Sequence, residues 1–266
     1  MKKFLTSMVL LLMSSALANA APITFVGTGV GTNTGNSLAA SVTFDSPSVG
    51  TFSVLLSNLS ANNPGYMPGD ALMGVFFDTT FNLNLNPISA DPGPGSVILG
   101  ASAIPIGDNL GNYFQYLNNP AGFSGGLSTL DKYGISGIGG SGMFGPGGNF
   151  SPGPTFVNLD GVDAAIVGND YSDALANGGM KLASKAPMEQ NSMLFNFSGL
   201  GAAFDLASIT NVQFIYGTKP DQLLNGSCAD CVINPQSIDA PEPGSMMMFG
   251  AGLLGLMMLR RRKIFI

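Results

Sequence analysis

The chain has 266 residues, of which only 10 % are charged, and its formal net charge is −6 at pH 7. Residues 21–239 keep four lysines against fifteen acidic residues, so this part lacks the basic surface that nucleic acid binding requires. The absence of histidine excludes the usual Ser-His-Asp triads, Cys-His dyads and His-ligated metal sites.

Residues 1–20 have the three parts of a secretory signal peptide. Lys2 and Lys3 supply the positive start, a mostly apolar stretch follows over residues 4–13, and Ala18-Asn19-Ala20 offers the small residues that signal peptidase reads. We therefore expect export through the Sec machinery and cleavage after Ala20. The alternative is an uncleaved anchor helix, but the apolar core is short and the small-residue site is well placed.

The body, residues 21–239, consists of short β-rich runs separated by turn signals made of Gly, Pro, Asn and Asp. Within residues 80–85, Phe81, Leu83 and Leu85 alternate with polar residues, which predicts a strand with one buried face. Strands are predicted over residues 22–30, 38–44, 50–59, 71–79, 80–85, 96–104, 155–159, 162–167, 191–197 and 209–217.

Residues 134–154 interrupt this pattern because nearly half of them are glycine and three are proline. Such a composition predicts a long loop or an internal linker. A phosphate-binding loop is disfavoured, since no Gly-Lys-Ser/Thr follows and no helix signal comes after the glycines.

Four carboxylates lie within fourteen residues: Asp160, Asp163, Asp170 and Asp173. Closely spaced oxygen ligands on loops can bind Ca²⁺, but this spacing does not match an EF-hand, and aspartate is common in ordinary turns. We therefore treat the four as a weak calcium candidate and expect turn residues. No other metal site and no cofactor is expected.

The two cysteines, Cys228 and Cys231, are separated by only two residues. An exported chain meets an oxidising compartment, and no second pair or histidine exists to complete a metal site. The spacing therefore predicts a local structural disulfide that pins a turn. A redox role is disfavoured because no βαβ pattern surrounds the pair.

The C-terminal segment, residues 240–266, contains fifteen residues without charge, from Ser245 to Leu259. As a helix this stretch reaches ~22 Å, against ~30 Å of hydrocarbon, so it spans a bilayer with snorkelling flanks or local thinning. The basic cluster that follows is the positive-inside signal. It consists of Arg260, Arg261, Arg262 and Lys263. These features predict a single transmembrane segment with the body outside the cytoplasm.

The order of Pro241-Glu242-Pro243, a short apolar stretch and an Arg-rich end resembles the PEP-CTERM sorting signal. The resemblance implies export in a Gram-negative, biofilm-forming bacterium and recognition of Pro241, Glu242 and Pro243 by an exosortase. It also implies a precursor that is held transiently in the inner membrane, then delivered to the cell surface or extracellular matrix. An ordinary tail anchor explains the apolar run and arginines but not the Pro-Glu-Pro. The two prolines keep that stretch extended, as a protease substrate must be.

Two further phrases, residues 72–78 and residues 209–218 preceded by 190–195, resemble a group of exosortase-sorted surface proteins with β-sandwich bodies. With the strand pattern, this predicts an all-β fold: an antiparallel, jelly-roll-like β-sandwich over residues 21–239. Phe76, Phe77, Phe214 and Tyr216 are the expected core residues in these phrases.

The first functional hypothesis is a non-catalytic exported surface or matrix protein. The alternative is a carbohydrate-binding or adhesive module, with exopolysaccharide as partner, that uses Tyr and Phe on loops and Asp or Asn for the sugar hydroxyls. A secreted hydrolase is a third hypothesis, which the lack of histidine and of a recognisable carboxylate pair disfavours.

Overall fold

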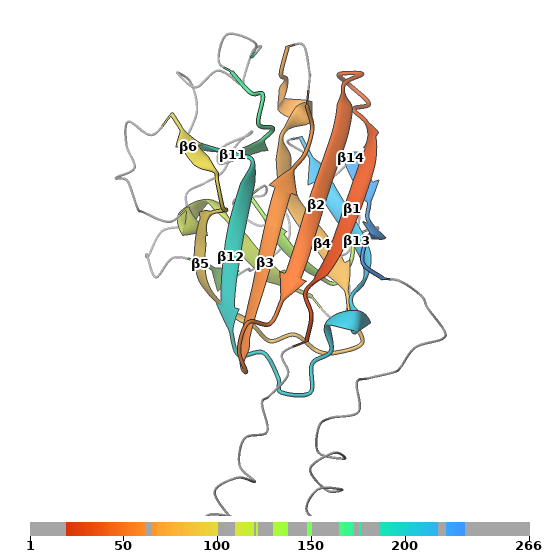
Figure 1. Cartoon of the computed structure of the whole chain (residues 1–266), viewed down its shortest axis with the longest axis vertical. Helices are drawn as coiled ribbons and strands as arrows, with labels where there is room; N and C mark the ends of the chain where they lie inside the picture. The colour runs from red at the N-terminus through yellow and green to blue at the C-terminus, as the bar shows by residue number, and fades with distance from the viewer. Residues whose placement is uncertain are drawn as a thin grey trace, which may run out of the picture. The chain divides into compact units, whose positions relative to one another are not determined.

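The computed structural model describes residues 20–61, 65–100, 110–119, 121, 130–137, 148–150, 165–172, 176, 187–217 and 222–231. All of them belong to one compact unit, Met1–Cys231, while Val232–Ile266 form a second unit outside the described residues. The described part contains strands and three short 3-10 helices but no α-helix, so the predicted all-β class is confirmed (Figure 1). The 3-10 helices are η1 (Pro68–Asp70), η2 (Gly111–Tyr113) and η6 (Leu206–Ser208).

The first sheet has six strands in the order β15-β1-β2-β3-β12-β5, and β12, β3, β2 and β1 lie side by side in Figure 1. Every pair in it is antiparallel. The strands are β1 (Ile23–Val30), β2 (Ser37–Asp45), β3 (Thr51–Asn58), β5 (Asn86–Pro92), β12 (Ser192–Ser198) and β15 (Ser227–Cys228).

The second sheet has nine strands, built around β4, which pairs with β8 on one side and β13 on the other. One of its pairs, β10 with β11, is parallel, so the prediction of a purely antiparallel sandwich is wrong at this point. The strands are β4 (Leu72–Asp78), β6 (Val97–Leu99), β7 (Gln115–Asn118), β8 (Tyr133–Ser136), β9 (Gly148–Asn149), β10 (Ile166–Val167), β11 (Met188–Gln190), β13 (Thr210–Tyr216) and β14 (Gln222–Asn225).

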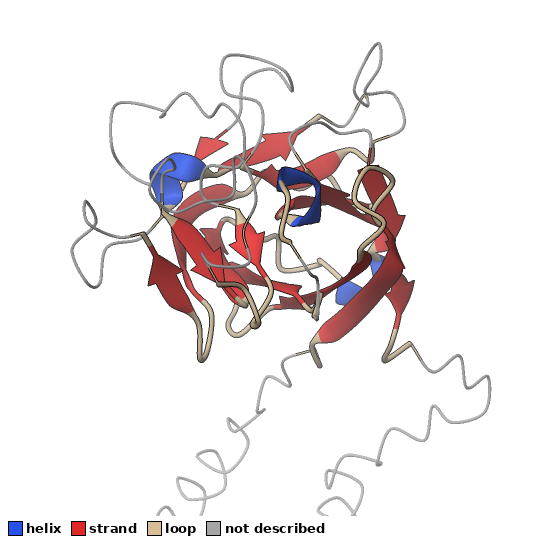
Figure 2. Ribbon diagram, turned by 90° about the horizontal axis from the view of Figure 1, so that it is seen from above, coloured by secondary structure: helices blue, strands red, loops and turns tan. Residues whose placement is uncertain are grey.

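The two sheets share one hydrophobic core, and in Figure 2 their strands enclose a common interior. Alternate residues of β2 and β3 point into it, which is the period of two that the sequence shows. The ring of Phe44 on β2 lies 4.9 Å from that of Phe77 on β4, and so joins the two sheets. Burying such an aromatic side chain stabilises the fold by about 1.5–3 kcal/mol.

Residues 80–85 do not form the predicted strand, although Leu83 and Leu85 are buried as the alternation indicates. Side chains, not a neighbouring strand, satisfy this backbone. The Leu83 carbonyl accepts hydrogen bonds from the Tyr116 hydroxyl at 3.0 Å and the Asn118 amide at 2.7 Å. The alternation therefore predicts correctly which side chains are buried. The segment is not a strand, because its backbone bonds to side chains and not to the backbone of a neighbouring strand.

The prediction of a loop over residues 134–154 is also wrong in part, because residues 134–136 belong to β8 and residues 148–149 form β9. Gly134 pairs across the sheet with Phe76, and a Cβ at this glycine would lie 2.6 Å from the Phe76 ring. The glycine thus makes room for a buried aromatic ring inside a strand. Most of the rest of the predicted loop lies outside the described residues.

Candidate functional site

Most residues of the predicted sorting machinery lie outside the described residues. These are the signal peptide except Ala20, the Pro241-Glu242-Pro243 motif, the apolar stretch 245–259 and the basic cluster 260–263. In the part of the chain that the structure describes, no helix is long and apolar enough to cross a membrane. What the structure does describe is the pair of ends from which these segments extend.

The first and last strands of the body are paired with each other. β15 lies antiparallel to β1, with Cys228 opposite Phe25 and Ser227 opposite Val26. One residue further, the backbone N–H of Ala229 donates to the Thr24 carbonyl at 2.8 Å. The described chain begins only four residues before Thr24 and ends two residues after Ala229. The first and last segments of the described part of the body are therefore neighbours at one edge of the first sheet.

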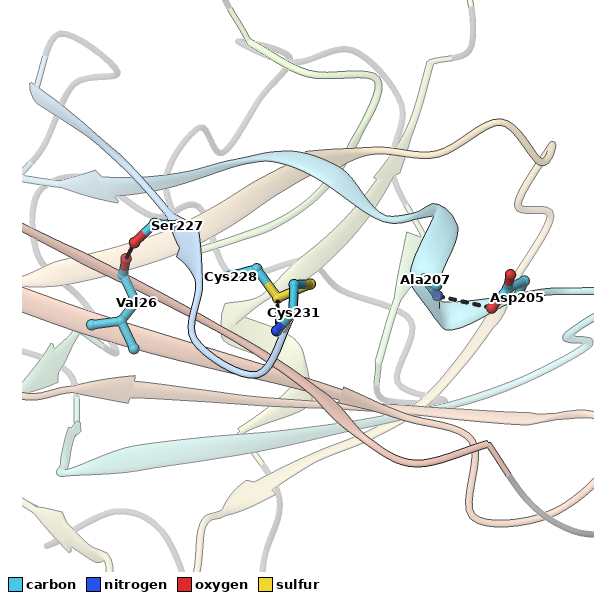
Figure 3. Close-up of a disulfide and its surroundings, with 6 residues drawn as sticks. All are labelled: Val26, Asp205, Ala207, Ser227, Cys228 and Cys231. Atoms are coloured by element: carbon cyan, nitrogen blue, oxygen red, sulfur yellow. Dashed lines mark hydrogen bonds between the residues drawn. A yellow bond between two sulfur atoms is a disulfide. The ribbon is translucent and has the colours of Figure 1, made fainter. Parts of the chain in front are cut away.

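Cys228 and Cys231 form a disulfide, with their Cα atoms 5.3 Å apart (Figure 3). The Cys228 side chain packs against the main core cluster, whereas Cys231 is exposed. The N–H of Cys231 donates to the Cys228 Sγ atom at 2.9 Å. Closing a four-residue loop removes chain entropy worth about 2 kcal/mol, so the bond contributes a limited part of the stability of the body.

The weak calcium candidate is not assembled by the described residues. Asp160, Asp163 and Asp173 lie outside them, and no group of three possible metal-ligating His, Cys, Asp or Glu side chains occurs in the described part. Asp170 is described, and its Oδ1 accepts a hydrogen bond of 2.5 Å from the Tyr66 hydroxyl. Burial, reinforced by this carboxylate, raises the pKa of Tyr66.

A buried carboxylate that sequence reasoning missed lies at η1. Asp70 is fully buried and accepts hydrogen bonds from Thr34 Oγ1 at 2.7 Å, Asn36 Nδ2 at 2.9 Å and the Met67 N–H at 2.9 Å. These bonds tie the loop between β1 and β2 to the segment before β4. With three donors already bound, Asp70 holds loops together.

Asn58, at the end of β3, connects the two sheets through a second buried polar group. Its Nδ2 donates to the Ile166 carbonyl at 2.8 Å, and its Oδ1 accepts from the Tyr216 hydroxyl at 3.3 Å. The same hydroxyl donates to the Ala39 carbonyl at 2.8 Å. Strands β2, β3, β10 and β13 thus meet at one hydrogen-bonded point. No sequence signal marks it, because the partners are up to 177 residues apart.

Two carboxyl groups have strongly raised pKa values. Burial, together with the neighbouring Asp78 charge, raises the pKa of Asp131 to about 7, although Lys132 lowers it in part. Burial raises the pKa of Glu189 to about 8, and neither of its carboxyl oxygens has a hydrogen-bond partner among the described residues. With these pKa values both groups exchange protons near neutral pH, which general acid-base chemistry also requires.

Neither carboxyl is among the residues that line the cavity beside Asn58, Asn169 and Asn191. This cavity, of about 440 Å³, is open to solvent and contains no acidic side chain. Its lining consists of Leu55, Ser57, Asn58, Leu59, Ala61, Pro94, Asn169, Asn191 and Ser192. The described residues therefore do not bring titratable groups and a cavity together.

The aromatic side chains expected to contact sugars are not exposed in the described part. All six tyrosines are described, and each is buried or half-buried. The same holds for every described phenylalanine. The rings form contacts within the core, such as the T-shaped pair of Tyr116 and Phe197 at 5.2 Å.

Comparison with known proteins gives one match, at the C-terminus. Residues 239–263 match the family model of the PEP-CTERM protein-sorting motif. This confirms the resemblance noted in the sequence: the chain carries the sorting segment of an exported protein that is processed in an exosortase-dependent way. Neither a search of curated proteins nor a search of solved structures found a match to the chain.

Proposed function

We propose that the chain is a non-catalytic exported protein, sorted through its C-terminal segment to the cell surface or the extracellular matrix. The observation that carries this proposal is the sorting-motif match over residues 239–263. In it, Pro241, Glu242 and Pro243 present an extended recognition segment to exosortase. Residues 245–259 hold the precursor in the inner membrane, and the basic cluster 260–263 fixes its orientation.

The pairing of the two ends of the body supports this route. Because Thr24 and Ala229 are hydrogen-bonded neighbours, the described part of the body begins and ends at adjacent points. A body built this way can stay on one side of the inner membrane while signal peptidase and exosortase each reach their own segment. A jelly-roll-like sandwich is the architecture we propose for the complete body.

The separation of carboxyl groups from the cavity supports the non-catalytic part of the proposal. The two carboxyls with raised pKa, Asp131 and Glu189, do not line the cavity at Asn169 and Asn191. A hydrolytic site needs its acid and base within reach of a bound substrate.

Replacing Glu242 by alanine should leave the precursor in the inner membrane. A recognition pocket built for this carboxylate would keep unpaired donors, so mature protein should fall by at least about tenfold. Membrane fractionation and intact mass of the released protein measure this. Unaltered chain should have a mass from Ala21 to a point near Pro243, less two hydrogens for the disulfide. Asp230→Ala, which removes an exposed charge outside the matched residues, is the control and should be sorted normally. Normal amounts of mature Glu242→Ala protein would show that the sorting proposal is wrong.

A second candidate, a carbohydrate-binding or adhesive module, is favoured by the outer face of the first sheet. Small hydroxyl and amide side chains make up much of this face, with Leu55, Leu194 and Asp91 among them, and the face carries no Lys, Arg or Glu. For example, Thr24 and Thr43 touch through their hydroxyls at 3.0 Å, and Asn196 Nδ2 donates to Ser89 Oγ at 3.1 Å. Neutral hydroxyl-rich chains such as exopolysaccharide match this chemistry.

A glycan array of the exported protein tests this candidate. If the face binds glycans, Thr43→Lys combined with Ser57→Lys should cover it with two long charged side chains and lower the signal at least about tenfold. Thr210→Lys, an exposed position on the second sheet, is the matched control and should bind as the unaltered protein does. An array without signal, or one unaffected by the double variant, removes this candidate.

A further inference from the structure

The last strands of the body cross from one sheet to the other. β13 lies beside β4 in the second sheet, and β14 pairs with β13. The chain then passes Gly226, whose N–H donates to the Val212 carbonyl at 2.7 Å, and continues as β15 beside β1 in the first sheet. Anything that pulls on the chain after Cys231 therefore acts first on β15, and only then on β14.

Behind β15, strand β1 packs tightly against β13 and β14, and this contact is called the seam below. Two glycines of β1 accept large side chains from the second sheet. A Cβ at Gly27 would lie 2.8 Å from Phe214, and one at Gly29 would lie 2.5 Å from Leu224. Lifting β14 away from β1 would expose both of these side chains, of which Phe214 is fully buried and Leu224 is 8 % exposed.

β15 itself has few contacts. Beyond its two paired residues it is held by packing of the Cys228 side chain against the core and by the Ala229 N–H to Thr24 carbonyl bond. A further bond of 3.2 Å runs from Ser227 Oγ to the Val26 carbonyl (Figure 3). Ser227, Ala229 and Cys231 are exposed. A short exposed segment of this kind opens readily on its own. The disulfide opposes opening, because the opened segment has less conformational freedom when Cys228 and Cys231 are joined.

We propose that β15 and its disulfide form a clamp, which keeps β14 and β13 in the second sheet while the chain beyond Cys231 is processed. The clamp consists of residues 227–231. The proposal rests on the proposed function only in assuming that the chain after Cys231 is pulled and cut. Its physical action, protection of the seam between β1 and β14, is a property of the body alone.

Hydrogen exchange of the exported chain tests the clamp. In Cys228→Ser/Cys231→Ser, amides of residues 227–229 and of β14 should exchange about 30-fold faster, the factor expected from losing a four-residue loop. Amides of β2 and β3 should be unchanged. Reduction of the folded, unaltered chain with a phosphine gives the same comparison if the variant does not accumulate. Ser227→Ala, which keeps the disulfide, should have a much smaller effect.

Faster exchange confined to residues 227–231, with β14 unaffected, would overturn the clamp, because the disulfide would then fix only its own turn. Unchanged exchange in both segments would overturn it as well. Accumulation of mature Glu242→Ala protein would instead contradict the sorting proposal, and would leave the exchange result standing. The two ideas therefore fail separately.

Discussion

Replacing Glu189 by glutamine should flatten the pH dependence of stability between pH 5 and pH 8. Glu189 lies on β11, opposite Ile166 on β10 and Ile98 on β6, and is fully buried. Its carboxyl oxygens have no hydrogen-bond partner among the described residues. A buried carboxylate without a partner is costly, and this cost keeps the group protonated in the folded chain.

The sign follows from the pKa of Glu189, which burial raises from 4.5 to about 8. Below pH 4.5 the carboxyl is protonated in both the folded and the unfolded chain, so its titration has no effect. Between these values unfolding releases one proton, and the free energy of unfolding falls by about 1.4 kcal/mol per pH unit. The total loss is about 3–5 kcal/mol, a large part of the stability of an ordinary domain.

Urea unfolding at several pH values measures this. The free energy of unfolding of the unaltered chain should fall as the pH rises. For Glu189→Gln it should fall by about 1.4 kcal/mol less per pH unit, the contribution of one proton. The pH dependence that remains in the variant should include a contribution from Asp131, because its pKa is also raised, to about 7. Asp230→Asn removes an exposed charge and is the control. Equal slopes for the Glu189 variant and the unaltered chain would show that this carboxyl is not held neutral.

Replacing Gly74 by alanine should prevent the body from folding. Gly74 lies in β4, between β8 and β13, at the centre of the second sheet. A Cβ at this position would lie 2.3 Å from the Ile135 carbonyl oxygen and 3.0 Å from the Ser136 Cα atom. These are backbone atoms of the neighbouring strand, so the two strands must separate and lose their hydrogen bonds. We expect a cost of at least about 4 kcal/mol.

Two matched glycine variants make this result interpretable. In Gly134→Ala the added Cβ would meet the Phe76 ring at 2.6 Å, and a side chain yields more easily than a backbone, so the loss should be intermediate. In Gly201→Ala nothing lies within 4 Å, and stability should change by less than about 0.5 kcal/mol. Thermal unfolding and the yield of folded protein measure how much stability each of the three variants loses. A folded Gly74→Ala body as stable as Gly201→Ala would contradict the close approach of β4 and β8.

Local patterns predicted the long strands well. Six predicted runs correspond to β1, β2, β3, β4, β12 and β13, because each combines β-branched or aromatic residues with turn signals at its ends. All four core residues expected from the two phrases, Phe76, Phe77, Phe214 and Tyr216, are buried. The seven-residue strand β5, at whose end the sequence predicts a turn, was not predicted, and neither were the short strands β7, β8, β9, β11, β14 and β15. Strands of two to four residues carry too little pattern of their own and exist because a neighbour pairs with them.

The sequence by itself identified the C-terminal sorting segment, which the family model matches over residues 239–263, and it predicts the signal peptide. Signal peptidase and exosortase read short linear motifs that need no fold around them. The sequence also predicted the local pairing of Cys228 with Cys231, since two cysteines three positions apart meet without help from the rest of the chain. Only the tertiary structure decided the neutral Glu189, the satisfied Asp70 and the pairing of β15 with β1. In each of these the energy of a group depends on atoms brought from distant segments, and no local pattern records which atoms those are.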